Sequence, residues 1–489
     1  MGGVTGGGVA VYSLRDDGSW ALAQALAPTG GGPSFGAALA LTAARPRAGG
    51  GVACVLLVAA PGSGDAFFYD CNGTGCALPP QRVPAAASGG AAACAVTPGA
   101  AVALSENGTF VAATAASAGL CGRVQVFRRV AGVWGAAAGD SVTVAGAAVD
   151  WGVSLAIGGP WVAVGDPNGL LCDAGGGGCT YGAALILRVD GGGVTTVVGR
   201  SAPGDASLPL GAAAGVGVAQ WGRALAVVLD APSSLDVAAA APGFRLVVGA
   251  PDAPAMDFVP SVGAVSVLYF PSGSLPSSPN ASRVVLPAAE VTMYGAAPAR
   301  YDRFGEVLAA DPVSHMLVVG APQAHGESGA LYVYGTARGA LFGLLQRRPW
   351  PARGGGVGVS STTLLACAND TGCTAVPLTH FCGVAAGGAT GAPRVGLSAC
   401  LVQLTPDSAT AYVGAAGVGG GGAGEPAAAA GAVLVYSLAN MSWSLTPVLL
   451  AAGVHASCGT AVAATPSVAF VGCPGLGKYK YKYKYKYKI

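Results

Sequence analysis

Cysteine and histidine are the residues of this chain that could react or bind a metal. There are thirteen cysteines and four histidines among 489 residues. Six cysteines stand in three close pairs, Cys71–Cys76, Cys172–Cys179 and Cys367–Cys373. A structural zinc site would require cysteine or histidine partners at C-x2-C type spacing, and none of these pairs has it. We therefore expect three disulfides, which form in oxidising compartments.

Symmetry about a turn predicts two further disulfides. In an antiparallel hairpin, residues at equal distances from the turn face each other. Cys94 and Cys121 are equidistant from the turn "ENGT", and Cys458 and Cys473 are equidistant from the dipeptide "TP". We expect a disulfide in each of these two hairpins.

The remaining cysteines are less constrained by spacing. Cys382 and Cys400 form a further candidate disulfide. Cys54 lies in the apolar strand "CVLLVAAP", and we expect it to be the odd buried thiol.

Asparagine is almost confined to N-glycosylation sequons. The chain holds six asparagines, and five of them stand in N-x-[ST] sequons, whereas chance would place about one there. All the sequons lie in segments with Gly, Ser or Pro that are typical of turns, where a glycan reaches solvent. This predicts a eukaryotic secretory route and a secreted, extracellular or cell-surface protein. The expected glycosylation sites are Asn72, Asn107, Asn280, Asn369 and Asn440.

The sequence contains no recognisable catalytic motif. It lacks the G-x-S-x-G nucleophile elbow, and the histidines His315, His325, His380 and His455 are scattered without recurring acidic neighbours. The "GGGG" runs lack the Lys-Ser/Thr of a phosphate-binding loop. We expect no enzyme activity, no catalytic residue and no cofactor.

Composition excludes several classes of partner. Only 10% of the residues are charged and the net charge is +2, which disfavours nucleic acid. The longest uncharged run, 426–477, is broken by Gly, Pro, Ser and Thr at strand-like intervals, so we expect strands and no membrane span. The segment "MGGVTGGGVAVY" lacks the features of a signal peptide, which indicates a mature or partial form.

Two short patterns recur along the chain and define its elements. The first is a strand that begins with Gly and alternates apolar residues, as in "GGVAVYSL", "GRVQVFRR", "GAVSVLYF" and "GAVLVYSL". The second is a hairpin that opens on an apolar residue plus Gly, such as Phe35-Gly36, Trp151-Gly152, Trp221-Gly222 and Phe304-Gly305. This hairpin closes on "VGAP" or a variant of it. It occurs seven times in order.

The paired "FG" and "VGAP" elements followed by "GAxxVY" resemble FG-GAP repeats, the blades of integrin-α-type β-propellers. The resemblance covers nearly the whole chain and is weakest in the sixth and seventh opening elements. It implies an all-β, seven-bladed β-propeller over 1–476. A four-stranded blade cannot bury both faces alone, so the blades must stack around an axis.

The two ends of the chain compete for the last blade. The segment "GGVAVYSLRDDGSWALAQAL" supplies two outer strands and "GTAVAATPSVAFVGCPG" supplies a hairpin, so we expect the N-terminal strands to close the last blade. The tail at 477–489, in which Lys and Tyr alternate, has the pattern of an edge strand. It could occupy the closing position, add to the sheet of a neighbouring molecule, or be a foreign segment.

FG-GAP blades often bind calcium through D-x-D-x-D-G loops, a pattern that this sequence lacks. The nearest candidates are Asp166 with Asn168 and Asp173, and Asp252 with Asp257, and neither set has the required spacing. We expect ordinary turn residues here and no metal site.

The longest insertion, at about 337–393, carries the candidate partner-binding residues. Arginine and tryptophan are enriched at interface hot spots, and loops on a rigid scaffold often carry recognition. A solvated linker is the competing interpretation. The candidates are Arg347, Arg348, Trp350 and Arg353.

Together these features predict a non-catalytic glycoprotein that binds an extracellular protein or glycan partner, in adhesion or in matrix or appendage assembly. One alternative is a subunit that forms a homo-polymer by strand exchange. The other is the accessory propeller of a hydrolase whose catalytic domain lies outside this chain.

Overall fold

The structure is a computed structural model that describes the strands and their immediate connections. The described residues are 7–17, 19–27, 34–42, 45–46, 52–60, 65–72, 75–83, 96–105, 110–117, 121–135, 141–145, 151–172, 179–189, 195–201, 220–229, 243–254, 261–271, 287–295, 300–311, 316–324, 330–334, 363–367, 373–377, 398–405, 408–415, 432–439, 442–450, 458–459, 461–464 and 468–474. The tail at 477–489, the residues from Arg347 to Arg353, and all four histidines lie outside them.

Within these residues the chain forms 32 strands in seven sheets. Sheet 1 contains β3 (Leu39–Leu41), β4 (Arg45–Pro46), β5 (Val52–Ala60), β6 (Asp65–Asn72), β7 (Gly75–Cys76) and β8 (Gln81–Val83). Sheet 2 contains β9 (Val96–Leu104), β10 (Phe110–Ser117), β11 (Cys121–Val130), β12 (Val133–Gly135) and β13 (Ser141–Ala145). Sheet 3 contains β14 (Leu155–Gly158), β15 (Trp161–Cys172), β16 (Cys179–Val189) and β17 (Thr195–Ser201).

The other four sheets follow the same plan. Sheet 4 contains β18 (Ala224–Leu229), β19 (Phe244–Ala250), β20 (Ala264–Phe270) and β21 (Ala289–Met293). Sheet 5 contains β22 (Val307–Asp311), β23 (Met316–Ala321), β24 (Ala330–Tyr334), β25 (Thr363–Cys367) and β26 (Cys373–Pro377). Sheet 6 contains β27 (Ser398–Thr405), β28 (Ser408–Ala415), β29 (Ala432–Ala439) and β30 (Ser442–Leu450). Sheet 7 contains β1 (Gly8–Leu14), β2 (Trp20–Leu26), β31 (Ala461–Ala464) and β32 (Val468–Cys473).

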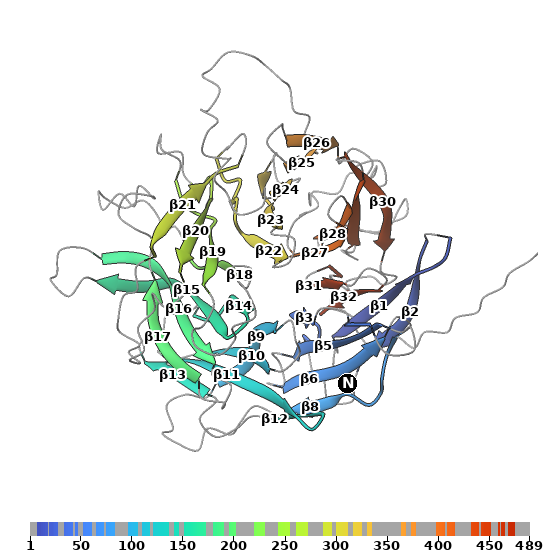
Figure 1. Cartoon of the computed structure of the whole chain (residues 1–489), viewed down its shortest axis with the longest axis horizontal. Helices are drawn as coiled ribbons and strands as arrows, with labels where there is room; N and C mark the ends of the chain where they lie inside the picture. Colours follow the sequence, from blue (N-terminus) through green and yellow to red (C-terminus); the bar gives the residue numbers. More distant parts are fainter. Residues whose placement is uncertain are drawn as a thin grey trace, which may run out of the picture.

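The sheets are arranged radially around a common centre, as in a β-propeller (Figure 1). The innermost strand of each sheet contacts the innermost strand of the next, and the last contacts the first. These strands, in order around the centre, are β3, β9, β14, β18, β22, β27 and β31. This arrangement leaves only short edges exposed at the rim.

The two ends of the chain meet in sheet 7. Its strand order is β2-β1-β32-β31, so β1 lies between β2 and the C-terminal hairpin. β1 pairs antiparallel with β32 without interruption, with Val11 opposite Phe470. The predicted pairing of the N-terminal strands with the last hairpin is confirmed.

Five glycines at hairpin openings have a conformation that other residues rarely adopt, with φ between 75° and 98°. Each donates its N–H to a carbonyl in the second strand of the hairpin that it opens, at 2.7 to 3.1 Å. These hydrogen bonds link the opening of the repeat to its closing strand. The glycines are Gly36, Gly152, Gly222, Gly305 and Gly459.

A second set of glycines allows adjacent sheets to approach closely. A Cβ atom on Gly165, Gly249 or Gly472 would overlap the carbonyl oxygen of an opening glycine in the next sheet. Similarly, a Cβ on Gly122 would overlap the indole ring of Trp151. The sequence repeats are therefore the places where one sheet packs against the next.

The hydrophobic core lies between the sheets rather than in one central mass. Each of the six core clusters of described residues draws its side chains from two neighbouring sheets. Between sheets 3 and 4, for example, Trp161 stacks on Phe244 with ring centroids 4.9 Å apart. Each sheet thus needs both neighbours in order to bury its faces.

Tyr69, on β6, is buried between sheets 1 and 7 and has a polar atom that the core does not satisfy. Its side chain is 1% exposed, and no described group forms a hydrogen bond with its hydroxyl. Burial raises the pKa of this phenol. The folded protein therefore holds Tyr69 in its neutral form.

We expect Tyr69→Phe to stabilise the fold by about 1 kcal/mol at neutral pH, because a buried hydroxyl without a partner is removed. In wild type the unfolded phenol ionises above about pH 10, whereas the buried phenol stays neutral. The unfolding free energy is therefore unaffected by this group below about pH 10 and falls as the pH rises further. The variant should lose less stability than wild type in that range. Urea unfolding at neutral and alkaline pH measures both effects, and a lower midpoint for the variant at neutral pH would contradict them.

Two local features differ from the simple repeat. β25 and β26, within the insertion at 337–393, join sheet 5, and β25 pairs with β24 in parallel.

The β9–β10 register also shifts between Ala113 and Ala115, so the symmetry used to pair Cys94 with Cys121 does not hold at that end of the hairpin. Cys94 lies outside the described residues, and its disulfide stays a prediction.

Candidate functional site

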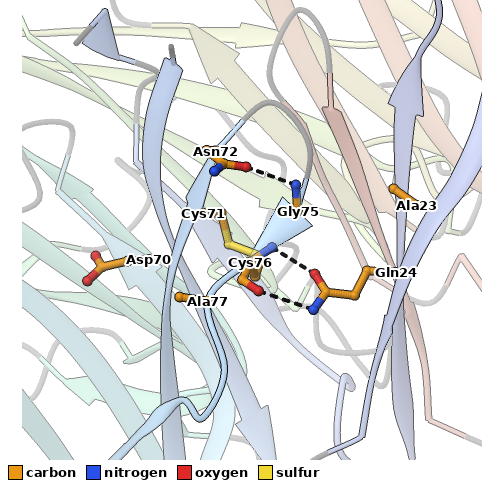
Figure 2. A pocket seen from close by; sticks show the side chains of 8 residues that line it. All are labelled: Ala23, Gln24, Asp70, Cys71, Asn72, Gly75, Cys76 and Ala77. Atoms are coloured by element: carbon orange, nitrogen blue, oxygen red, sulfur yellow. Dashed lines mark hydrogen bonds between the residues drawn. A yellow bond between two sulfur atoms is a disulfide. The ribbon is translucent and has the colours of Figure 1, made fainter. Parts of the chain in front are cut away.

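A surface depression lies at the rim, between sheet 1 and sheet 7 (Figure 2). It has a volume of about 530 Å³ and is formed by β2 on one side and by β6 and β7 on the other. Its lining residues are Ala23, Gln24, Asp70, Cys71, Asn72, Gly75, Cys76 and Ala77.

Gln24 connects the two sheets across this depression. Its side-chain Nε2 donates to the carbonyl of Cys76 at 3.1 Å, and its Oε1 accepts from the N–H of Cys76 at 2.7 Å. Figure 2 shows this side chain reaching from β2 to the backbone of β7. One glutamine amide thereby takes the place of a neighbouring strand at the edge of β7.

A disulfide forms the floor of the depression. Cys71 on β6 and Cys76 on β7 are bonded, with their Cα atoms 4.0 Å apart. The disulfide predicted from their spacing is confirmed. A second disulfide joins Cys458 to Cys473 in sheet 7, and it confirms the symmetry argument for that hairpin.

For two of the other predicted disulfides the structure shows that the two cysteines lie opposite each other on paired strands. Cys172 lies opposite Cys179 in the β15–β16 register, and Cys367 lies opposite Cys373 in the β25–β26 register. Cys382 lies outside the described residues, so its pairing with Cys400 stays a prediction.

Asn72 is the one predicted glycosylation site among the described residues. Its side chain is exposed at the rim of the depression, and its Oδ1 accepts a hydrogen bond from the N–H of Gly75 at 3.0 Å. Asn107, Asn280, Asn369 and Asn440 lie outside the described residues.

Asp70 joins the depression to sheet 2. Both of its carboxylate oxygens accept from Nη2 of Arg129 at 2.8 Å, and the Arg129 guanidinium also lies 5.8 Å from the centroid of the Trp134 ring. The side-chain amide of Gln81 donates through Nε2 to the carbonyl of Trp134 and accepts through Oε1 from its N–H. Sheets 7, 1 and 2 are thus linked at the rim by Gln24, Asp70 and Gln81.

Exposed apolar side chains lie along the same three sheets. Leu78 and Val133 are 63% and 61% exposed. Leu78 lies between Cys76 and Gln81 in the sequence, and Val133 directly precedes Trp134. The elements that carry them are in contact, since β2 touches β7 and β8 touches β12. We call this set the outer-rim patch. It consists of Leu22, Leu78, Val130 and Val133.

Of the residues considered for metal binding, Asp166 and Asn168 lie on β15, where Asp166 is buried, and Asp252 belongs to a group of ion pairs. Asp252 lies 3.5 Å from Nε of Arg303, which also pairs with Glu306 at 2.9 Å. Arg223 lies 3.6 Å from the other oxygen of Glu306, so this group of charges joins sheets 4 and 5. Within the described part of the chain, no group of His, Cys, Asp or Glu has the arrangement of a metal site. Asp173 and Asp257 lie outside that part.

Sequence reasoning missed the outer-rim patch and the bridging role of Gln24. Single exposed apolar residues form no periodic pattern in the sequence, and a glutamine that bonds to the edge of a distant strand forms none either. The register of β5 with β6, by contrast, could have been predicted from the sequence. Cys54 and Cys71 are equidistant from the turn in "APGSGD", and the structure places them opposite each other on β5 and β6.

No family model matches the sequence, and no curated protein matches it. Among solved structures, a putative 6-phosphogluconolactonase from Bacteroides uniformis is 10% identical with a TM-score of 0.38, over 88% of this chain and 85% of that one. AofleA from Arthrobotrys oligospora is 10% identical with a TM-score of 0.40, over 87% and 89%. The β-propeller domain of the Trilobed protease from Pyrococcus furiosus is 9% identical with a TM-score of 0.33, over 84% and 86%. Likeness at this level carries no information about function.

Proposed function

We propose that this chain is a secreted or cell-surface glycoprotein that binds a protein partner without catalysis. In this proposal each of the seven sheets is one blade of a propeller of the FG-GAP type. The close contacts of the repeat glycines support this assignment, because they give the "FG" and "VGAP" elements a packing role at the joints between sheets 2 and 3, 3 and 4, 4 and 5, and 7 and 1.

An extracellular location is supported by the disulfides and by Asn72. Disulfides persist in oxidising compartments, and two are present among the described residues. Asn72 is exposed, as an attached glycan requires. The residues that the structure describes contain no helix long and apolar enough to cross a membrane.

The observation that carries the binding role is the outer-rim patch. Single exposed apolar residues are common, but four on three contacting sheets suggest an interaction surface. The Asp70–Arg129 ion pair joins two of these sheets and would supply polar contacts at the rim of an interface. The candidates Arg347, Arg348, Trp350 and Arg353 remain a second proposed surface.

The test uses protein expressed through a eukaryotic secretory pathway and immobilised on beads. We expect wild type to retain a specific protein from a mixture of secreted and cell-surface proteins, and the double variant Leu78→Ser/Val133→Ser to lose it. Tyr301→Ser is the matched control, because Tyr301 is 49% exposed but lies next to sheet 5, outside the patch. Identical retention by all three proteins would refute the role of the patch. A failure of wild type to be secreted, or to lose mass on treatment with an endoglycosidase, would refute the location.

Self-assembly by strand exchange is the second candidate. It is favoured by the way in which sheet 7 closes, since β1 and β2 come from the opposite end of the chain to β31 and β32. The same two strands could complete sheet 7 of a neighbouring copy, as in domain swapping. Concentration-dependent oligomers of the purified protein would support this alternative.

A further inference from the structure

Three cysteines stand in a row across the strands of sheet 1. Cys54 on β5 lies opposite Cys71 on β6, and Cys71 lies opposite Cys76 on β7. Directly opposed residues of antiparallel strands point to the same face of the sheet, with Cβ atoms about 5 Å apart. All three side chains belong to the core cluster between sheets 1 and 7.

The outer two positions differ in chemistry and in access to solvent. Cys54 is a thiol and is 5% exposed, whereas Cys71, at 2% exposed, is bonded to Cys76. Cys76 is 9% exposed and lines the depression at the rim. The row therefore runs from a buried thiol, through a disulfide, to the surface.

We propose that Cys54, Cys71 and Cys76 form a thiol–disulfide exchange relay, and that it makes Cys76 a site of mixed-disulfide formation with small disulfide compounds. This inference goes beyond the proposed binding function and does not rest on it. The register suits the reaction, because it places the Cys54 thiol on one side of Cys71 and the disulfide partner Cys76 on the other.

The first step is an internal exchange. The Cys54 thiolate attacks Sγ of Cys71, a Cys54–Cys71 disulfide forms, and the Cys71–Cys76 bond breaks. The electron pair of that bond leaves with Sγ of Cys76, which takes up the proton that Cys54 lost. No oxidant is consumed, and the thiol has moved from the core to the floor of the depression.

The second step uses a low-molecular-weight disulfide as the co-reactant. The Cys76 thiolate attacks one of its sulfurs, a mixed disulfide forms on Cys76, and one small thiol is released. Overall, the protein thiol is oxidised into a mixed disulfide, one sulfur of the small disulfide is reduced and leaves as a thiol, and the number of disulfides is unchanged. The depression of about 530 Å³ falls in the range of small-molecule sites, so it can receive a substituent the size of a tripeptide.

Gln24 gives the relay a means of keeping Cys76 in place when its disulfide opens. Both backbone polar groups of Cys76 are hydrogen-bonded to the Gln24 side chain, independently of the sulfur. β7 has only two residues, and we expect it to stay docked on β2 during exchange.

The second disulfide of the described residues serves as an internal control. Cys473 on β32 lies opposite Gly8 on β1, the position that corresponds to Cys54. Because that position is a glycine, no thiol lies opposite Cys473 on β1. The Cys458–Cys473 bond is also fully buried, so solvent cannot reach it. We expect no exchange there.

The experiment incubates the purified, folded protein with oxidised glutathione for hours, the timescale of uncatalysed disulfide rearrangement. Thiols are then blocked under acid quench, and chymotryptic cleavage at the aromatic residues of β6 separates Cys54 from the peptide that carries both Cys71 and Cys76. Fragmentation of that peptide in the mass spectrometer, between Cys71 and Cys76, assigns the disulfide and the adduct. We expect a Cys54–Cys71 disulfide, a glutathionyl group on Cys76, and an unchanged Cys458–Cys473 bond. Cys54→Ser should show no adduct and an intact Cys71–Cys76 bond.

The wild-type map decides the proposal even if the Cys54→Ser variant does not fold. An adduct on Cys54 with the Cys71–Cys76 bond intact would overturn it, because the buried thiol would then react directly. The absence of any adduct would also overturn it, as would an adduct on Cys76 in the Cys54→Ser variant.

Discussion

Replacing Gly249 by alanine is expected to destabilise the protein by about 3 kcal/mol, at the upper end of what overpacking usually costs. The added Cβ would overlap the carbonyl oxygen of Gly305 in the next sheet. A flexible side chain could move away from the new methyl group, but this oxygen belongs to the backbone. Gly305 is itself fixed by its φ of 90° and by its hydrogen bond to the carbonyl of Gly320.

The matched control for Gly249→Ala is Gly135→Ala. Gly135 lies at the end of β12, where an added Cβ would meet no atom within 4 Å. We expect this variant to stay within about 0.5 kcal/mol of wild type. Denaturant unfolding of the three proteins tests the prediction. Equal midpoints for Gly249→Ala and wild type would mean that the sheets can separate at this joint without loss.

The double variant Cys458→Ala/Cys473→Ala is expected to lose about 3 kcal/mol of unfolding free energy. The bond closes a loop with a sequence separation of 15, and in the chain-entropy model a loop of about this length contributes about that much. Both sulfurs are buried in the core between sheets 6 and 7. Their removal therefore also leaves small packing defects.

Thermal unfolding with and without a reductant tests this second prediction. Reductant should lower the melting temperature of wild type toward that of the double variant and should change the variant less. The corresponding variant Cys71→Ala/Cys76→Ala is a useful comparison, since its loop has a separation of only 5 and its loss should be smaller. Equal losses in the two variants would contradict the entropic explanation.

The sequence predicted those parts of the fold in which a local pattern has a local cause. The opening glycines recur because a positive φ is needed there, and the strands are apolar on both faces because each sheet packs between two others. The pairing of β1 with β32 followed from counting incomplete repeats at the two ends. Cys71–Cys76 and Cys458–Cys473 followed from hairpin spacing and symmetry.

What the sequence did not predict depends on contacts between distant segments or on a local irregularity. The bulge between Ala113 and Ala115 cannot be inferred from the alternation of small apolar residues, because Ala suits either register. The parallel pairing of β25 with β24 has no signal in a region without repeats. The link from Gln24 to Cys76 joins residues of different sheets, and such a link requires the ring to be known first.

The closure of sheet 7 has a consequence for how the molecule reaches its folded state. β1 and β32 are neighbours in the sheet but far apart in the sequence, with Val11 opposite Phe470, so among the described strand pairs this one has the greatest loop-closure cost. During synthesis β1 is made long before β32. One edge of β1 must therefore remain unpaired, and prone to mispairing, until β32 has been synthesised. We expect ring closure to be the slow final step of folding.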